Sequence, residues 1–139
     1  MKKKEEKIVR IGFVNVNGIG MYARDARSED IRRFINDKTV DVIGLAETNV
    51  HWGKVHAYHS LWDRTKRWSP NRRVGVAYNV HQRLPTAYQP GGTATIAVED
   101  MAHRFHSSGQ DAKELGRWSW VKVAGKQDCV TRFVTVYTV

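Results

Sequence analysis

Three polar residues stand where two apolar stretches of the sequence end. Asn15 lies inside the β-branched run 8–16, Asn17 follows two positions later, and Glu47 comes directly after the apolar run 40–46. A carboxylate beside two amide oxygens is a hard ligand set that Mg²⁺ accepts, with water completing its octahedron. Such an ion would polarise a phosphoryl oxygen and stabilise a leaving oxygen. Periodicity alone favours a plainer alternative, in which Asn17 begins a turn and Glu47 begins a helix.

A strand, a helix and a second strand would position these residues. The run 8–16 predicts a strand that ends at Asn17, and the run 40–46 predicts a buried strand. Between them Ser28 is predicted to cap a short helix with one apolar face. This order implies a right-handed crossover and two parallel strands. Both strands would then end at the carboxyl edge of the sheet, where α/β proteins commonly bind ligands.

The rest of the chain predicts one more main helix and several strands. The apolar spacing over 51–68 is helical, while the polar stretch 99–116 is irregular apart from one helical turn near 101–105. The predicted strands cover residues 73–79, 92–98, 118–123 and 129–139, the last two forming a hairpin. No linker divides the 139 residues, so one domain is expected, preceded by a charged, flexible terminus at 1–7.

Basic residues are concentrated in the segment 64–73, around one tryptophan. The chain has 23 Lys and Arg against 14 Asp and Glu, a formal charge of +9, which suits a polyanion but also an anionic membrane or simple solubility. A mixture of cations and an aromatic ring suits phosphate contacts and base stacking. A solvated helix face is the equally weighted alternative. The candidates are Arg64, Lys66, Arg67, Trp68, Arg72 and Arg73.

Cysteine and hydropathy exclude several classes of protein. Cys129 is the single cysteine, which excludes an intramolecular disulfide and a cysteine-based zinc cluster. It fits a reducing, intracellular compartment, either nucleus or cytoplasm. The first residues contain no apolar signal-peptide core, and no apolar run approaches the roughly 20 residues that span a bilayer, so no membrane partner is expected.

Several motifs, in a consistent order, resemble the endonuclease/exonuclease/phosphatase superfamily, and among its AP-endonuclease-like members the branch associated with retroelement reverse transcriptases. The first two are Asn-Val-Asn-Gly-Ile at 15–19 and Asp-Val-Ile-Gly-Leu-Ala-Glu-Thr at 41–48. The later ones are Val-Ala-Tyr-Asn at 76–79, Gly-Gly-Thr-Ala at 91–94, Leu-Gly-Arg-Trp-Ser-Trp at 115–120 and Val-Thr-Val-Tyr at 134–137. The resemblance covers nearly the whole chain.

The resemblance implies an α/β (α+β) fold, a four-layer αββα sandwich of which residues 8–139 would form the N-terminal half. This part would supply the first sheet, its two covering helices and part of the second sheet. We therefore expect a truncated domain whose missing C-terminal half completes the fold.

The resemblance also implies roles for individual residues. Glu47 would bind Mg²⁺, or Mn²⁺ in its place. Asn17 stands where many members have Asp, so it would be a weaker metal ligand. Asn15 would hydrogen-bond the catalytic centre or the phosphate, and Tyr137 would contact the scissile phosphate through its hydroxyl. Arg117, within the motif at 115–120, joins the basic candidates for nucleic-acid binding.

The implied function is Mg²⁺-dependent cleavage of a phosphodiester in DNA, as in a retroelement that nicks its target. The later family motifs, Asp-x-Asn and Asp-His, do not occur in the sequence. Since such groups act as a unit, this chain alone is expected to be nearly inactive. Two alternatives stay open: an enzyme of the same fold that acts on a phosphorylated small molecule or lipid, and a non-catalytic or degenerate fragment that binds nucleic acid.

Overall fold

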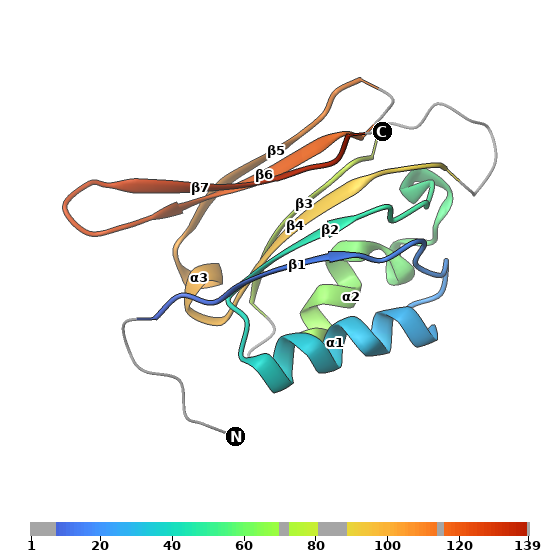
Figure 1. Cartoon of the computed structure of the whole chain (residues 1–139), viewed down its shortest axis with the longest axis horizontal. Coiled ribbons are helices and arrows are strands. Elements are labelled where there is room, and N and C mark those ends of the chain that lie inside the picture. Colours follow the sequence, from blue (N-terminus) through green and yellow to red (C-terminus); the bar gives the residue numbers. More distant parts are fainter. Residues whose placement is uncertain (1–7, 70–72, 81–88, 114–115, 139) are drawn as a thin grey trace.

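Two sheets and a layer of helices make up the computed structural model, which describes residues 8–69, 73–80, 89–113 and 116–138. The helices α1 and α2 cover one face of a four-stranded sheet, and a three-stranded sheet lies against its other face (Figure 1). The elements are β1 (Ile11–Asn15), α1 (Ala26–Lys38), β2 (Val42–Ala46), η1 (Trp52–Lys54), η2 (Ala57–His59), α2 (Leu61–Trp68), β3 (Val74–Tyr78), β4 (Thr93–Val98), α3 (Glu99–His103), β5 (Phe105–Gln110), β6 (Trp118–Ala124) and β7 (Val130–Val136).

The first sheet has the strand order β1-β2-β4-β3. Strands β1 and β2 are parallel, with Asn15 opposite Ala46 at their carboxyl ends, and α1 forms the connection between them. The predicted strand-helix-strand unit is therefore confirmed. Strand β4 runs antiparallel to both of its neighbours. The second sheet is antiparallel throughout, in the order β5-β6-β7.

Strand β4 is buried on both faces because it lies between the helices and the second sheet. Its residues Ala94, Ile96 and Val98 belong to the core cluster that packs against α1 and α2. Ala97 belongs instead to a smaller cluster with Val121 of β6. This alternation with period two accounts for a fully apolar or small-residue strand in the middle of the sandwich.

The two sheets also share a polar contact. The Thr95 hydroxyl lies 2.7 Å from the Thr135 hydroxyl and 3.0 Å from the backbone carbonyl and the hydroxyl of Ser119. Gly44 of β2 permits the close approach here, since a Cβ on it would lie 2.5 Å from the Thr135 hydroxyl oxygen. Hydrogen-bonded buried hydroxyls fix the register of one sheet on the other, which apolar contacts alone do less specifically.

Helix α1 begins differently from the prediction. Its N-cap is Asp25, whose carboxylate accepts hydrogen bonds from the backbone N–H groups of Arg27 and Ser28. Ser28, the predicted cap, lies in the first turn, is buried and donates its hydroxyl to Asp25 at 2.6 Å. The prediction was wrong by three residues because either side chain is a good cap in isolation.

The predicted helix over 51–68 is also shorter than expected. Two separate 3-10 turns, η1 and η2, precede α2, which begins only at Leu61. The side chains of His56 and Ser60 accept hydrogen bonds from backbone N–H groups two and three residues later, which divides the segment. None of the described helices is long and apolar enough to cross a bilayer.

Strand β5 was not predicted, because residues 99–116 are polar and lack alternation. The strand lies at the edge of the second sheet and none of its residues is buried, so burial leaves no pattern in its sequence. It pairs with β6 with an irregularity between Phe105 and Ser107. The helical turn expected near 101–105 is present as α3.

Candidate functional site

The carboxyl ends of β1 and β2 are joined beyond the strands by backbone hydrogen bonds. The Gly18 N–H donates to the Glu47 carbonyl at 2.7 Å, and the Ile19 N–H donates to the Thr48 carbonyl at 3.0 Å. Both Asn17 and Glu47 have left-handed backbone conformations, with φ of 45° and 56°. A left-handed glutamate is uncommon, and strained residues of this kind cluster at functional sites. These backbone hydrogen bonds and dihedral angles fix the direction in which the Glu47 side chain leaves the main chain.

The Glu47 carboxylate receives two side-chain donors from different strands. Its Oε1 accepts from the Asn15 amide Nδ2 at 3.0 Å and from the Tyr137 hydroxyl at 2.7 Å. Asn15 ends β1 in the first sheet, and Tyr137 follows β7 in the second. The Tyr137 N–H donates to the Arg117 carbonyl at 2.8 Å, which holds the tyrosine beside β6. Three residues predicted for the site thus meet at one carboxylate oxygen.

These hydrogen bonds set the protonation of the group. The Asn15 amide and then the Tyr137 hydroxyl lower the pKa of Glu47 below its ordinary 4.5, against a small opposing effect of burial. The same contact raises the pKa of Tyr137, because its proton is shared with a carboxylate. At neutral pH Glu47 is therefore an anion and Tyr137 a neutral donor. The site therefore carries a negative charge on a carboxylate whose orientation is fixed by two hydrogen bonds.

Asn17 joins this group through its backbone. Its N–H donates to the Asn15 Oδ1 at 3.0 Å, while its side chain makes no hydrogen bond with any residue that the structure describes. The sequence analysis extended the first strand to Asn17, but β1 ends at Asn15 and Asn17 lies in the turn that follows. The Asn15 amide thus both orients Glu47 and anchors the turn.

Asn49 is a supporting residue that the sequence analysis missed. Its side-chain oxygen accepts from the Gly91 N–H at 2.8 Å, and its own N–H donates to the Gly91 carbonyl at 2.8 Å. Gly92 has φ of 92°, and a Cβ on it would lie 2.5 Å from the Thr48 hydroxyl oxygen. These contacts pack the turn before β4 against the segment just after Glu47. The Gly-Gly pair was the available signal, since it marks a close backbone approach.

The donor set suits a hard divalent ion that keeps most of its water. Among the residues that the structure describes, no three His, Cys, Asp or Glu side chains gather into a metal-binding group, so Glu47 would act as a single protein carboxylate. Its Oε2 accepts no hydrogen bond from the described residues. Mg²⁺ is commonly held by one or two carboxylates plus waters and substrate phosphates. Glu47, with an oxygen free and its charge retained, fits that mode.

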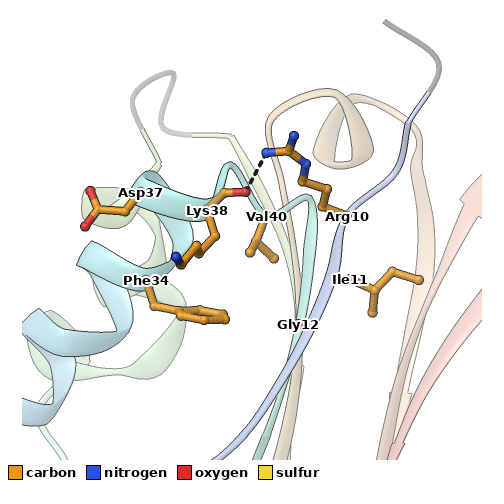
Figure 2. Close-up of a pocket in the computed structure, with 7 residues that line it drawn as sticks. All are labelled: Arg10, Ile11, Gly12, Phe34, Asp37, Lys38 and Val40. Carbon is orange, nitrogen blue, oxygen red and sulfur yellow. Dashed lines mark hydrogen bonds between the residues drawn. The ribbon is translucent and has the colours of Figure 1, made fainter. Parts of the chain in front are cut away.

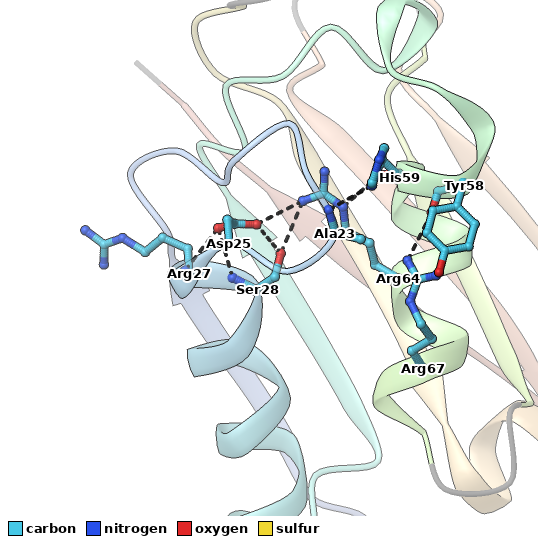
Figure 3. Close-up of polar contacts among 8 residues, drawn as sticks. All are labelled: Ala23, Asp25, Arg27, Ser28, Tyr58, His59, Arg64 and Arg67. Carbon is cyan, nitrogen blue, oxygen red and sulfur yellow. Dashed lines mark hydrogen bonds and ion pairs between the residues drawn. The ribbon is translucent and has the colours of Figure 1, made fainter.

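The basic candidates divide into buried and exposed residues. Arg64 is 0% exposed and Trp68 is 4% exposed, so neither side chain can reach a phosphate or a base. Figure 3 shows Arg64 turned inward, where it donates to the His59 carbonyl, the Ser28 hydroxyl and the Asp25 carboxylate. The nucleic-acid role predicted for Arg64 and Trp68 is therefore wrong in this structure, because both belong to the packing of α2.

Four of the other basic candidates lie at the surface of the described structure. Arg67, Arg73 and Arg117 are exposed and Lys66 is half-buried. The Arg73 guanidinium lies 3.0 Å from a ring nitrogen of His103. Arg72 lies outside the described residues. These side chains stay predicted contacts for nucleic acid.

A separate hollow lies at the other end of β1. It has a volume of about 530 Å³ and opens between Arg10–Gly12 and the last turn of α1, with Phe34 as its largest apolar wall (Figure 2). Its charged residues are Arg10, Asp37 and Lys38, and the Arg10 guanidinium donates to the Lys38 carbonyl. This hollow is at the amino end of β1, whereas Asn15 and Glu47 are at the carboxyl ends of their strands.

Two solved structures are similar to this chain. An AP endonuclease from Archaeoglobus fulgidus superposes with a TM-score of 0.51 at 19% identity, over 85% of this chain and 38% of that chain. An endonuclease/exonuclease/phosphatase family protein from Leptotrichia buccalis C-1013-b superposes with a TM-score of 0.58 at 12% identity, over 95% of this chain and 54% of that chain. No protein-family model and no curated protein sequence matches the chain.

The similarity establishes the fold. The chain has the mixed α/β fold of endonuclease/exonuclease/phosphatase proteins, which confirms the predicted fold class. It spans 38% and 54% of the lengths of the two chains that it matches. At these identities the similarity extends to the fold alone, and the chemistry of the site depends on its own residues.

Proposed function

We propose that this chain carries the metal-binding part of a phosphodiesterase site that acts on DNA. The observation that carries the proposal is the convergence of Asn15 and Tyr137 on the Glu47 carboxylate, across two sheets, at the carboxyl edge of a parallel strand pair. This position is typical of ligand sites in α/β proteins. The similarity in fold to an AP endonuclease supports a nucleic acid as the substrate.

Glu47 would hold Mg²⁺, or Mn²⁺ in its place, through Oε2, which accepts no hydrogen bond from the described residues. When bound, the ion would neutralise charge on a phosphoryl group and on the leaving oxygen. Asn15 and Tyr137 would keep the carboxylate ionised and aimed, since both donate to its other oxygen. Tyr137 has one proton, and it is directed at Glu47, so its contact with a phosphate would require substrate to redirect it.

In its more specific form, the proposal is that the enzyme nicks target DNA, as retroelement nucleases do. Surface cations support it, because Arg67, Arg73 and Arg117 are exposed on a chain with a formal charge of +9. Neither an Asp-x-Asn nor an Asp-His motif occurs in the sequence. We therefore expect this chain to bind the metal and the nucleic acid but to cleave DNA slowly or not at all.

The test measures metal binding apart from cleavage. Mn²⁺ would be titrated into the protein and the free ion quantified by electron paramagnetic resonance, for the wild type, Glu47→Gln and Glu29→Gln. Glu29 is a matched control because it is a half-buried glutamate of α1 that pairs with Arg32. We expect at least a tenfold loss of affinity in Glu47→Gln and no change in Glu29→Gln, since the metal requires the charged carboxylate.

Nicking of supercoiled plasmid with Mg²⁺ provides the second readout. Equal Mn²⁺ binding by the wild type and Glu47→Gln would contradict the metal site. If DNA binding then remained, the chain would be a non-catalytic nucleic-acid-binding protein. Rapid nicking that depends on Glu47 would instead contradict the expected weak cleavage, and would mean that this chain is sufficient for the reaction.

A further inference from the structure

Large aromatic side chains are exposed on α2, on the segment just before it, and on the segment that precedes α1. Tyr22 is 67% exposed, Tyr58 is 56% exposed and Trp62 is 47% exposed. Together with His59 we call them the aromatic face. None of these three rings belongs to the hydrophobic core, to which α2 contributes Leu61 instead. Grouped, exposed rings of this size commonly mark an interaction site.

The aromatic face is held in place by its neighbours. The His59 ring packs edge-on against both Tyr22 and Tyr58, with ring centroids 5.5 and 5.3 Å apart. The His59 Nδ1 also accepts the Ala23 N–H at 3.0 Å, which ties the segment after β1 to η2 (Figure 3). Tyr22 therefore stands on the same segment that begins with Asn17, so the aromatic face and the candidate site share one stretch of backbone.

Two cations lie over these rings. The Lys66 ammonium is 3.2 Å from the centroid of the Trp62 ring, and the Arg67 guanidinium is 4.5 Å from that of Tyr58. Asp63 forms an ion pair with Arg67 at 2.8 Å. Because Asp63 pairs with Arg67, no carboxylate among these residues compensates the charge of Lys66. A hollow of about 450 Å³ lies between Tyr58, Asp63, Lys66 and Arg67.

We propose that the aromatic face binds single-stranded DNA, with bases stacked on Trp62 and Tyr58 and backbone phosphates beside Lys66. Exposed rings interleaved with cations are the chemistry by which proteins hold single strands, since every base has a π-face and every nucleotide a charge. A duplex stacks its bases on one another and so hides the base faces that these rings would contact. The charge of the chain, +9, complements this occupant.

The inference goes beyond the proposed phosphodiesterase and does not require it. It adds a surface for an unpaired strand, and residues 17–25 connect this surface to the candidate site along the backbone. If the metal site proves wrong, binding of single strands would still stand. The two are separated experimentally because the Glu47 carboxylate is hydrogen-bonded to Asn15 and Tyr137, which lie outside the aromatic face.

The experiment measures fluorescence anisotropy of labelled oligonucleotides with EDTA present, so that no metal contributes. Three probes of roughly 12 nucleotides would be compared: a mixed-sequence single strand, its duplex, and a strand of abasic sites with the same phosphates. We expect the wild type to bind the single strand more tightly than either other probe. Trp62→Leu should weaken single-strand binding by about tenfold and leave the abasic strand unchanged.

Two further variants separate stacking from charge and from loss of structure. Trp62→Phe keeps an aromatic ring and should retain most of the affinity, whereas Lys66→Gln should lower the slope of log affinity against log salt by about 0.7. Circular dichroism must show unchanged helix content in each variant. Equal affinity for base-bearing and abasic strands, or wild-type affinity in both Trp62→Leu and Tyr58→Leu, would overturn the proposal. Glu47→Gln should bind the single strand as the wild type does.

Discussion

Arg64 and Arg67 lie three residues apart on α2, and truncation of Arg64 should destabilise the fold far more than truncation of Arg67. The Arg64 side chain is fully buried, and its guanidinium donates to the His59 carbonyl at 2.7 Å, the Ser28 hydroxyl at 3.2 Å and the Asp25 carboxylate at 3.3 Å. It also lies 5.2 Å from the ring centroid of Trp52. Arg67 is exposed and makes a surface ion pair.

The magnitude follows from these contacts. Three hydrogen bonds from a charged donor are worth about 1.5 kcal/mol each at the low end, or roughly 4–5 kcal/mol together. Part of this stabilisation is offset because burial of the charged Arg64 side chain costs free energy. Desolvation lowers its pKa to about 10, despite the nearby Asp25 carboxylate. Removing the side chain also leaves a cavity and strands its partners. We expect Arg64→Ala to lower the free energy of unfolding by about 3–5 kcal/mol, and Arg67→Ala by about 1 kcal/mol or less.

Urea unfolding followed by circular dichroism measures the difference. With a denaturant slope of about 2 kcal/mol per molar, the midpoint should fall by about 2 M in Arg64→Ala and by less than about 0.5 M in Arg67→Ala. If the two variants unfolded at the same midpoint, the buried network drawn in Figure 3 would not stabilise the fold, and the reasoning would be refuted.

Two other perturbations test the site and the contact between the sheets. Tyr137→Phe removes a donor from Glu47, so the pKa of Glu47 should rise toward its ordinary 4.5 in a carbon-13 carboxyl titration; an unchanged pKa would contradict the hydrogen bond. Because this pKa is lowered in the folded state, the stability it contributes is present above pH 4.5 and is lost as the pH falls through the lowered value, and the variant should have less to lose. Gly44→Ala places a Cβ 2.5 Å from the Thr135 hydroxyl oxygen and should destabilise the fold by about 1–3 kcal/mol. Calorimetry should therefore show a melting temperature lower by several degrees, and an unchanged value would mean that the sheets separate easily at this point.

The parts of the fold that the sequence predicted are those where burial imposes a period. The β1-α1-β2 unit has a clear apolar pattern, and its topology placed Asn15 and Glu47 at one edge before any contact was known. Where burial is weak, the prediction had no basis. Strand β5 carries exposed polar residues, so only its pairing with β6 defines it.

Contacts between distant segments explain the other differences. Arg64 and Lys66 are similar in sequence terms, yet one faces the core and the other the surface. Nothing local distinguishes them, because the partners that accept Arg64 include Asp25 and Ser28, 39 and 36 residues away. Tyr137 was predicted for the site by resemblance, but its hydroxyl contact with Glu47 spans 90 residues and depends on how the sheets pack.

The candidate site therefore depends on the sandwich as a whole. Glu47 extends from the first sheet and Tyr137 from the second, and Thr135, two residues before Tyr137, is the residue that Thr95 of β4 holds by a buried hydrogen bond. A shift of β7 by one residue would turn Tyr137 to the opposite face, because side chains alternate along a strand. The Thr95–Thr135 contact thus fixes the register that brings the tyrosine to the carboxylate. Formation of the site should be coupled to docking of the second sheet, with Glu47 losing one of its two donors whenever the sheets separate.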